Sequence, residues 1–200
     1  MPANGENGES TAWRWLRSRF SAVFQTQTDN VMDVISEQRL AAVHPLLADK
    51  IRLLAAQLEA QGIVIRVTQG LRTWEEQEAL YAQGRTAPGN IVTNAEAGYS
   101  WHNFGLAVDV VPLDGSNAPD WNVSHPVWAT ITKAGQNLGL TSGSAWRSFP
   151  DWPHFQLTGN LPISPPPSVR AAYIQGGTAA VWAQTGLDVM PSDVDGEISV

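Results

Sequence analysis

The segment SWHNFGLAVDVV, residues 100–111, sets the architecture that the rest of the chain must accommodate. It places His102 and Asp109 seven residues apart, with Gly105 between them to permit a turn and an apolar strand after it. Because side chains alternate across a strand, Asp109 faces one way and the valines on either side of it face the core. His102 and Asp109 can then point into one cleft, although the pair alone also fits a hydrogen-bonded support for a turn.

A second segment, DWPHFQL at residues 151–157, adds a histidine and another acid. His154 falls on a predicted strand, Asp151 precedes it by three residues, and Pro153 stiffens the link. Two histidines and one carboxylate form a donor set that holds a catalytic zinc and leaves a fourth position for water. Asp151 is then an additional acid that can take a proton from that water. The two segments together therefore predict metal-assisted amide hydrolysis.

The composition excludes several other kinds of chemistry. The 200 residues contain no cysteine, which rules out a disulfide framework, a thiolate zinc site and a cysteine nucleophile. Any metal must therefore be held by aspartate, glutamate or the four histidines. The formal net charge of -7 argues against broad attraction to phosphates, so we expect no nucleic acid partner. No apolar run reaches the roughly 18 residues that a membrane span requires.

The patterning around these segments mixes helices and strands. Residues 44–62 predict a helix with one apolar stripe, and residues 63–69 alternate as a strand. Thr73 and Glu76 form a capping box that begins another helix. The order lacks a regular alternation of strand and helix, so the expected fold class is α+β. The remaining expected elements are a loop over 85–103, a helix over 126–139 and a strand over 152–157.

Differences in composition divide the chain into three parts. Residues 1–30 are predicted to be an N-terminal arm in which residues 11–25 form a short basic amphipathic helix. This helix either packs on the domain that follows or contacts a membrane or envelope surface. Residues 31–160 carry the catalytic domain. Residues 161–200 comprise a proline-rich spacer, one or two short helices broken at a Gly-Gly pair, and an acidic tail.

The two histidine segments also carry a family resemblance. The pattern S-x-H-x-x-G-x-A-x-D at residues 100–109 is followed by D-x-P-H-F at residues 151–155. Together they resemble the zinc peptidases of the D-Ala-D-Ala peptidase and L-alanyl-D-glutamate endopeptidase family, which share a fold with the hedgehog signalling domain. The resemblance covers residues 35–158 and implies a small antiparallel sheet flanked by helices.

Two longer strings narrow the resemblance to one branch of that family. VTQGLRTWEEQEALYAQGRT and IVTNAEAGYSWHNFGLAVDVVP resemble the L-alanyl-D-glutamate endopeptidases found in phage endolysins and bacterial cell-wall hydrolases. An aspartate rather than a glutamate at Asp151 favours the same branch, because the other branches generally use glutamate there.

The resemblance implies roles for five side chains. His102, Asp109 and His154 are the ligands of one zinc ion per chain, and Asp151 is the general base. Arg72 lies near the scissile carbonyl, where a guanidinium stabilises a developing oxyanion or holds a substrate carboxylate. Without the resemblance, an arginine between a strand and a helix fits a surface ion pair with a nearby glutamate at least as well.

Several other side chains flank the ligands or resemble them. Tyr99, Ser100 and Trp152 are expected to contact substrate, although aromatic residues beside a small core also serve ordinary packing. His44 and His125 each precede a proline at a helix start. A histidine at such a position satisfies backbone groups, so both are left out of the metal site.

These features predict a zinc-dependent hydrolase of peptidoglycan stem peptides, and the resemblance makes L-alanyl-D-glutamate the expected bond. Two alternatives stay open: a D,D-carboxypeptidase that trims terminal D-alanine, and a non-catalytic zinc-containing module that binds cell wall. The first residues show no basic segment followed by an apolar stretch, so no secretory signal is recognised. We therefore expect a monomer made in the cytoplasm that reaches the wall at phage lysis or through dedicated export.

Overall fold

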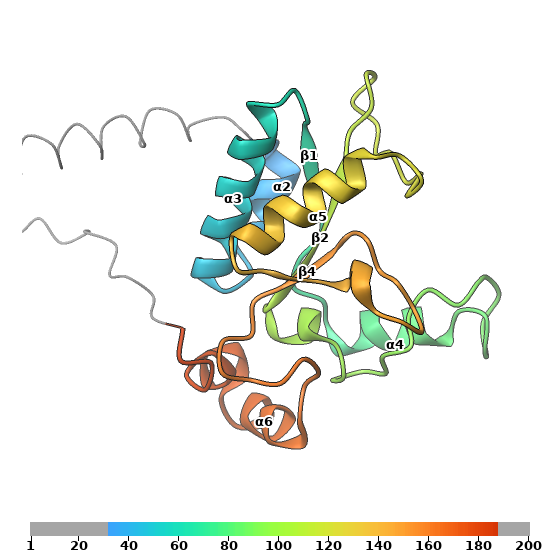
Figure 1. Ribbon diagram of the computed structural model, residues 1–200. Helices are drawn as coiled ribbons and strands as arrows, with labels where there is room; N and C mark the ends of the chain where they lie inside the picture. The colour runs from blue at the N-terminus through green and yellow to red at the C-terminus, as the bar shows by residue number, and fades with distance from the viewer. Residues whose placement is uncertain (1–31, 188–200) are drawn as a thin grey trace, which may run out of the picture.

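The computed structural model describes residues 32–187, which build one small antiparallel sheet with helices around it (Figure 1). The four strands are hydrogen-bonded in the order β1-β2-β4-β3, and every neighbouring pair is antiparallel. The strands are β1 (Ile65–Gln69), β2 (Ala107–Pro112), β3 (Thr141–Ser142) and β4 (His154–Gln156). The expected α+β class with a small antiparallel sheet is confirmed.

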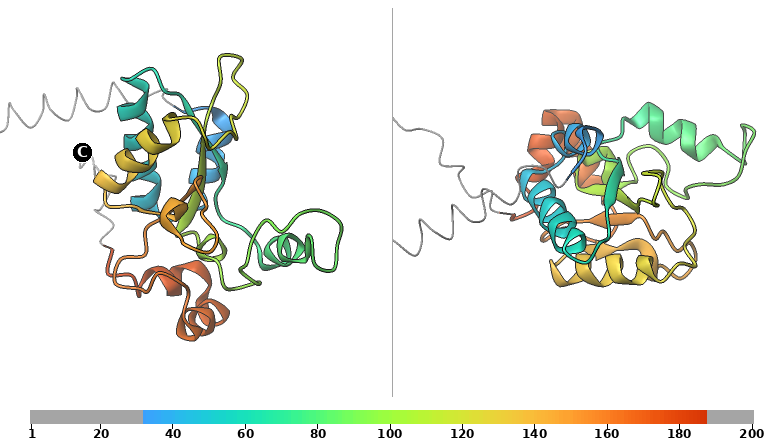
Figure 2. Two further views of the ribbon diagram at one scale, coloured as in Figure 1. Left: turned by 45° about the vertical axis from the view of Figure 1, so that its right-hand side comes forward. Right: turned by 90° about the horizontal axis from the view of Figure 1, so that it is seen from above.

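The helices cover the sheet unevenly. Helices α3 and α5 pack together on one side of the sheet, and α6 lies near η1 at the far end of the molecule (Figure 1). Figure 2 shows α4 and the loop after it projecting from the body as an arm. The α-helices are α2 (Val34–Leu40), α3 (Pro45–Glu59), α4 (Trp74–Ala82), α5 (Val127–Asn137) and α6 (Pro167–Trp182), and the 3-10 helices are η1 (Trp101–Phe104) and η2 (Gly143–Ala145).

Helix α3 supplies much of the main core. Its apolar stripe is fully buried and packs with strands β1 and β2 and helix α5, as its 3.6-residue periodicity predicts. Gly62 follows the helix with a positive φ of 76°, a conformation that glycine adopts without a steric penalty. The buried residues of the stripe are Leu47, Ile51, Leu54 and Leu58.

Strand β1 begins at Ile65 rather than at residue 63, two residues later than the alternation predicts. The backbone N–H of Ile63 donates to the carbonyl of Leu58, 3.0 Å away, and thereby caps the end of α3. This N–H is therefore not available to the sheet. The side chain of Ile63 still packs against the core, so the expected inward direction holds.

Strand β2 shows the predicted alternation around Asp109. Val108 and Val110 are fully buried in the main core, while the Asp109 side chain keeps 19% of its surface exposed. Asp109 lies directly opposite His154 in the register of β2 with β4. The sheet therefore places two of the predicted site residues on facing positions of neighbouring strands.

The C-terminal segment packs against η1. Helix α6 begins at Pro167, whose missing N–H is harmless in the first helical turn. It is interrupted at Gly176 and Gly177, where the sequence predicts a break. Val169 and Val181 are buried in a second cluster with the aromatic residues of η1. The division of the chain into three parts stays a prediction.

Some of the sequence expectations fall on residues that the structure does not describe. The N-terminal arm, including residues 11–25, and the acidic tail from residue 188 lie outside the described range. Within residues 32–187, no helix is both long enough and apolar enough to cross a bilayer.

The close contact between α5 and β4 gives a first prediction. Gly135 lies inside α5, and a Cβ atom there would clash with the ring of Phe155 in β4. Phe155 is fully buried, so its ring has little room to move. We expect Gly135→Ala to lower the free energy of unfolding by about 1–2 kcal/mol, despite alanine's better helix propensity.

Urea denaturation of the wild type and of Gly135→Ala measures this difference in the free energy of unfolding. Gly115→Ala is the matched control, because a Cβ at Gly115 meets nothing within 4 Å. A Gly135→Ala protein as stable as the wild type would show that α5 and β4 pack less closely than described.

Candidate metal centre

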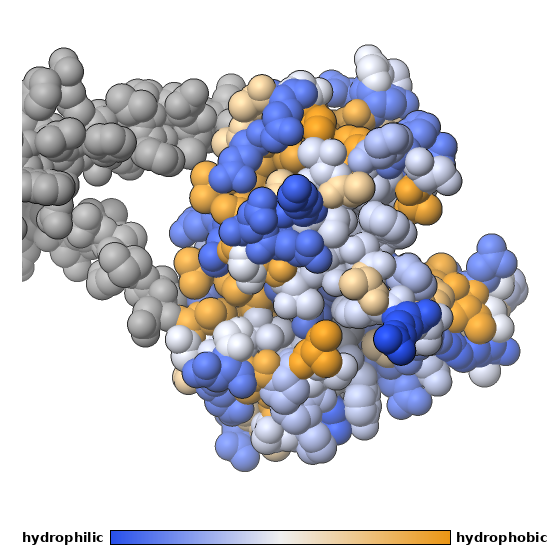
Figure 3. Space-filling model, viewed as in Figure 1, coloured by the Kyte–Doolittle hydropathy of each residue, from blue (hydrophilic) through white to orange (hydrophobic). Residues whose placement is uncertain are grey.

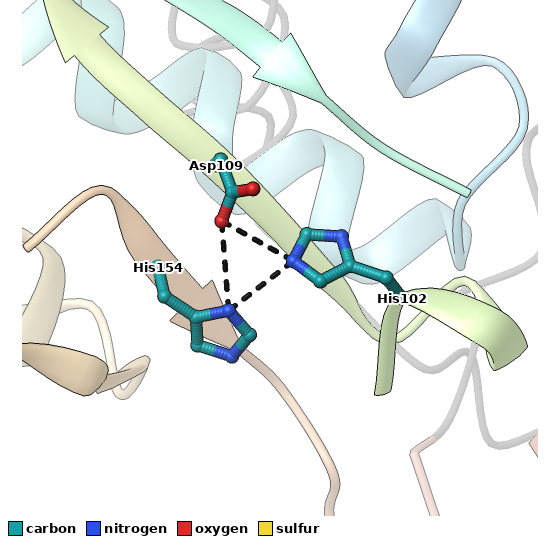
Figure 4. A group of neighbouring side chains, drawn as sticks. All are labelled: His102, Asp109 and His154. Atoms are coloured by element: carbon teal, nitrogen blue, oxygen red, sulfur yellow. Dashed lines mark hydrogen bonds and ion pairs between the residues drawn. The ribbon is translucent and has the colours of Figure 1, made fainter. Parts of the chain in front are cut away.

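Three side chains from three different elements converge at one end of the sheet (Figure 4). Asp109 Oδ1 lies 3.2 Å from His102 Nε2 and 3.5 Å from His154 Nδ1. The two imidazole nitrogens are 3.2 Å apart. His102 comes from η1, Asp109 from β2 and His154 from β4, so residues 52 positions apart in the chain meet here.

Local structure explains how His102 reaches this position. Ser100 is the N-cap of η1, and its hydroxyl oxygen accepts a hydrogen bond from the backbone N–H of His102. Gly105 ends η1 with a positive φ of 65° and turns the chain into β2. A Cβ at Gly105 would also come within 3.2 Å of the Ala42 carbonyl oxygen. Glycine is therefore favoured in this predicted turn for two reasons. Its positive φ ends η1, and its lack of a side chain leaves room for the Ala42 carbonyl.

In each imidazole, the ring nitrogen that points away from Asp109 lies beside a hydrogen-bond acceptor. His102 Nδ1 lies 2.9 Å from the carbonyl oxygen of Gly70, and His154 Nε2 lies 3.0 Å from Oε1 of Gln156. A neutral histidine that donates to these acceptors presents an unprotonated nitrogen on its other side. His102 Nε2 and His154 Nδ1 then face Asp109 with lone pairs, so all three converging atoms are electron-pair donors.

The electrostatics of the cluster favour a bound cation. Burial alone would raise the pKa of the Asp109 carboxyl, but the neighbouring His102 and His154 hold it below its ordinary range. Burial would lower the pKa of His154, but hydrogen bonding and charge from Asp109, with a contribution from Asp151, raise it. The carboxylate thus stays ionised and attracts positive charge to the nitrogens beside it.

The donor set fits zinc in kind and in spacing. Ligand atoms about 2.1 Å from a tetrahedral zinc lie roughly 3.4 Å from one another. The three observed separations of 3.2, 3.2 and 3.5 Å lie close to that value. Three protein ligands are also the number found in catalytic rather than structural sites. The cluster is therefore a candidate metal centre.

Asp151 lies in the same cavity as these three side chains. Its backbone N–H donates to the carbonyl of Gly143, and its own carbonyl accepts from the backbone N–H of His154. Burial, followed by the negative charge of Asp109, raises the pKa of the Asp151 carboxyl above its ordinary value. A carboxylate with a raised pKa is a stronger proton acceptor, which suits the base role implied by the resemblance.

Arg72 follows β1 and points into the same cavity. Its Nη2 lies 3.5 Å from Asp109 Oδ2, and its Nη1 donates to Gln77 Oε1 at 2.8 Å. Its Nε is buried with no hydrogen-bond partner among the described residues. Burial lowers the pKa of Arg72, while the carboxylates nearby oppose that shift, and the guanidinium stays protonated. Arg72 is therefore a buried cation at the centre rather than a surface ion-pair partner of Glu75 or Glu76.

The cluster lies on a groove of about 920 Å³ between the arm and the body. Figure 3 shows the molecular surface hollowed on the side where the arm projects. The arm contributes Leu80 and the loop 92–95, and the opposite wall is formed by residues 146–149. Trp121 lies on the rim and is more than half exposed. The groove is large enough for several residues of a peptide.

The expected substrate contacts fall into two groups. Tyr99 and Ser100 both line the groove, and one face of the Tyr99 ring is covered by the Arg170 guanidinium. Trp152 lies between Asp151 and Pro153, which line the groove, but does not line it itself. A substrate contact for Trp152 therefore has no support in this geometry, whereas Trp146 lines the groove and its ring centroid lies 4.9 Å from that of His154.

The remaining histidines lie elsewhere. His44 is buried at the start of α3, where its Nδ1 accepts from the backbone N–H of Leu46. His125 is exposed in the loop before α5 and pairs with Asp120. Both lie outside the metal centre, as the sequence predicts.

Sequence reasoning missed the residues that support the ligands. Gln77 is fully buried and joins Arg72 to the carbonyl of Ala95, and Gln156 contacts His154. Gln156 had one recognisable signal, since it shares a strand face with His154 two residues earlier. Trp146 and Arg147 carry no pattern that would assign them to the groove.

The chain is also similar to known proteins. The sequence matches the VanY D-alanyl-D-alanine carboxypeptidase family over residues 40–143. It is 34% identical over 125 residues to the peptidoglycan L-alanyl-D-glutamate endopeptidase CwlK of Bacillus subtilis (strain 168), an alignment that covers 59% of this chain and 75% of that protein.

Two solved structures are also similar. The L-Ala D-Glu endopeptidase ChiX of Serratia marcescens is 28% identical, with a TM-score of 0.48, covering 62% of this chain and 87% of ChiX. The LD-carboxypeptidase LdcB is 14% identical, with a TM-score of 0.46, covering 74% of this chain and 71% of LdcB.

The family match covers more than half of the chain, and CwlK is matched over three quarters of its length. The chain therefore belongs to the VanY D-alanyl-D-alanine carboxypeptidase family, and it is a peptidase. The resemblance drawn from the two histidine segments is confirmed. The family match includes Arg72, His102 and Asp109 but ends before β4, so Asp151 and His154 rest on the geometry described above.

The ligand assignment gives a second prediction. His154→Ala removes one of three donors, so we expect stoichiometric zinc binding to be lost in equilibrium dialysis followed by metal analysis. His125→Ala is the matched control, because this histidine is exposed and pairs only with Asp120 among the described residues. A His154→Ala protein that retains one tightly bound zinc would remove His154 from the ligand set.

Proposed function

We propose that this peptidase is a zinc-dependent peptidoglycan hydrolase that cleaves the L-alanyl-D-glutamate bond of the stem peptide. The observation that carries the proposal is the convergence of three electron-pair donors, from His102, Asp109 and His154, in a groove that also holds Asp151. The choice of bond follows from CwlK, whose name states that activity and whose length the chain matches over three quarters.

His102, Asp109 and His154 would hold the zinc, with one ion per chain. When bound, the metal supplies Lewis-acid polarisation of the scissile carbonyl and lowers the pKa of a coordinated water. Asp151 takes the proton of the attacking water and delivers it to the leaving amine. Arg72 provides a fixed positive charge where negative charge develops on the carbonyl oxygen.

The size of the groove favours cleavage within a peptide. An endopeptidase must accept substrate on both sides of the scissile bond, whereas a carboxypeptidase needs to hold only one terminal residue on the far side. The cavity has a volume of about 920 Å³ and is lined by the arm, Tyr99 and Trp121 as well as by the metal centre, so it offers more space than one terminal residue fills.

A D,D-carboxypeptidase is the second candidate, because the description of the matching family names that activity. The products distinguish the two reactions: an endopeptidase creates a new D-glutamate amino terminus, and a carboxypeptidase releases free D-alanine. A non-catalytic wall-binding module would need no proton acceptor, so the buried Asp151 beside a complete donor set opposes that alternative.

The third prediction concerns the product and the base together. Digestion of purified peptidoglycan, followed by mass spectrometry, should reveal new D-glutamate amino termini that disappear after chelation. Asp151→Asn should retain zinc but lose activity by on the order of 10²-fold or more, as expected for a general base. Asp114→Asn, in an exposed turn after β2, is the control and should cleave normally.

Two results would change the proposal in different ways. Free D-alanine without new amino termini would assign the chain to the carboxypeptidase reaction. Bound zinc without any cleavage product would favour the wall-binding module.

We further propose a lytic setting for this activity. The chain would act on the wall as a monomer, either after release at phage lysis or after dedicated export, with the basic residues 11–25 contacting the envelope.

Deleting residues 1–28 should then weaken lysis of intact cells while leaving hydrolysis of purified sacculi unchanged. Equal losses in both assays would instead assign residues 1–28 a structural role.

A further inference from the structure

One backbone carbonyl lies between the two elements that carry the histidine ligands. The carbonyl oxygen of Ile163 accepts a hydrogen bond from Trp101 Nε1 at 2.9 Å and another from Gln156 Nε2 at 3.0 Å. Trp101 precedes His102 in η1, and Gln156 follows His154 by two residues in β4. The carbonyl itself belongs to the segment between β4 and α6.

The hydrogen bond to Ile163 fixes the orientation of the Gln156 amide. Gln156 is almost fully buried, with 2% of its surface exposed, so water does not compete for its polar atoms. Because a carbonyl can only accept, the NH₂ group of Gln156 must point toward Ile163. Its Oε1 is therefore the atom that faces His154 Nε2.

The orientation of the amide in turn fixes the proton on His154. An amide oxygen can only accept, so His154 must carry its proton on Nε2 to satisfy the 3.0 Å contact. The lone pair then lies on Nδ1, the nitrogen that faces Asp109 and His102. A flipped amide would direct its NH₂ group at Nε2, favour the other tautomer and place a proton where the metal should be.

We propose that Gln156 is a positioning residue that holds His154 in the Nε2–H tautomer, and that the carbonyl of Ile163 determines this by orienting the Gln156 amide. The inference deepens the proposed function and rests on it for the identity of the metal. It makes the segment after β4 part of the metal centre, although that segment contributes no ligand.

The two histidines are held in different ways. The far nitrogen of His102 faces the backbone carbonyl of Gly70, which no substitution removes. The far nitrogen of His154 faces a side chain, so the two positions differ in their sensitivity to mutation. Substituting Gln156 therefore isolates the contribution of the outer hydrogen bond without changing any ligand.

Two substitutions separate the role of the acceptor from that of side-chain volume. Gln156→Met keeps the length of the side chain but removes both hydrogen bonds. Gln156→Glu keeps an acceptor for His154, but it replaces the donor to Ile163 with a carboxylate oxygen and adds a negative charge. Gln61→Met is the control, because Gln61 is exposed just after α3 and its side chain donates to the backbone carbonyl of Gln57.

The experiment measures tautomer and metal affinity in the full chain. Long-range ¹⁵N–¹H NMR of the metal-free protein, at a pH where His154 is neutral, reports which imidazole nitrogen carries the proton. Competition with a chromophoric chelator gives the zinc affinity. We expect the Nε2–H tautomer in the wild type, a mixture of tautomers and zinc binding weaker by about 10–100-fold in Gln156→Met, and near-wild-type values for both in Gln156→Glu and Gln61→Met.

Three results would overturn the inference. These are an Nδ1–H tautomer at His154 in the wild type, unchanged zinc affinity in Gln156→Met, and a Gln156→Glu protein as impaired as Gln156→Met. If Gln156→Met does not fold, the wild-type tautomer and the Gln156→Glu affinity still decide the matter.

None of these readouts depends on substrate, so the inference and the proposed function can fail separately. A wild-type protein with the expected tautomer and tight zinc, but without cleavage of peptidoglycan, would contradict only the proposed function. A cleaving wild type with an equally tight Gln156→Met variant would contradict only the inference.

Discussion

The pairing of β2 with β4 is the constraint on which the centre depends. Asp109 and His154 are direct partners in this antiparallel register, so the sheet itself brings the carboxylate and one imidazole together. A shift of one residue would turn Asp109 into the main core and a buried valine toward the groove. The burial of Val108 and Val110 on the other face makes that shift costly, so the hydrophobic core and the metal centre depend on the same register.

The other parts of the centre are arranged around this pair. The turn at Gly105 connects η1 to β2 and delivers His102, and the end of β1 delivers Arg72 to the same cavity. The segment after β4 supports both histidine-bearing elements. The carbonyl of Ile163 accepts hydrogen bonds from Trp101 and Gln156, and α6 packs on η1. Elements that contribute no ligand therefore determine how the ligands are oriented.

Sequence reasoning succeeded where the signal is local or where a residue type has few alternatives. The capping box at Thr73 is observed with both of its hydrogen bonds, and the stripe of α3 is buried as its periodicity predicts. With only four histidines and no cysteine, few donor sets were available. The two histidines that the structure brings together with Asp109 are the two that the segments single out.

The features that sequence did not supply depend on contacts between distant segments. The role of Gln156 requires the carbonyl of Ile163, whose position is set by how the chain returns toward η1. The two-residue strand β3 is too short to show any periodicity. The groove includes Trp146 rather than Trp152 because the direction of a loop side chain depends on the turn that carries it, and composition does not specify that turn.

Zinc K-edge X-ray absorption of the full chain measures whether His102, Asp109 and His154 jointly bind one metal ion. We predict one zinc per chain, with two imidazole nitrogens and further oxygen ligands at roughly 2.0–2.2 Å. A stoichiometrically bound zinc with fewer than two imidazoles in its coordination shell would show that these three residues do not form the site together.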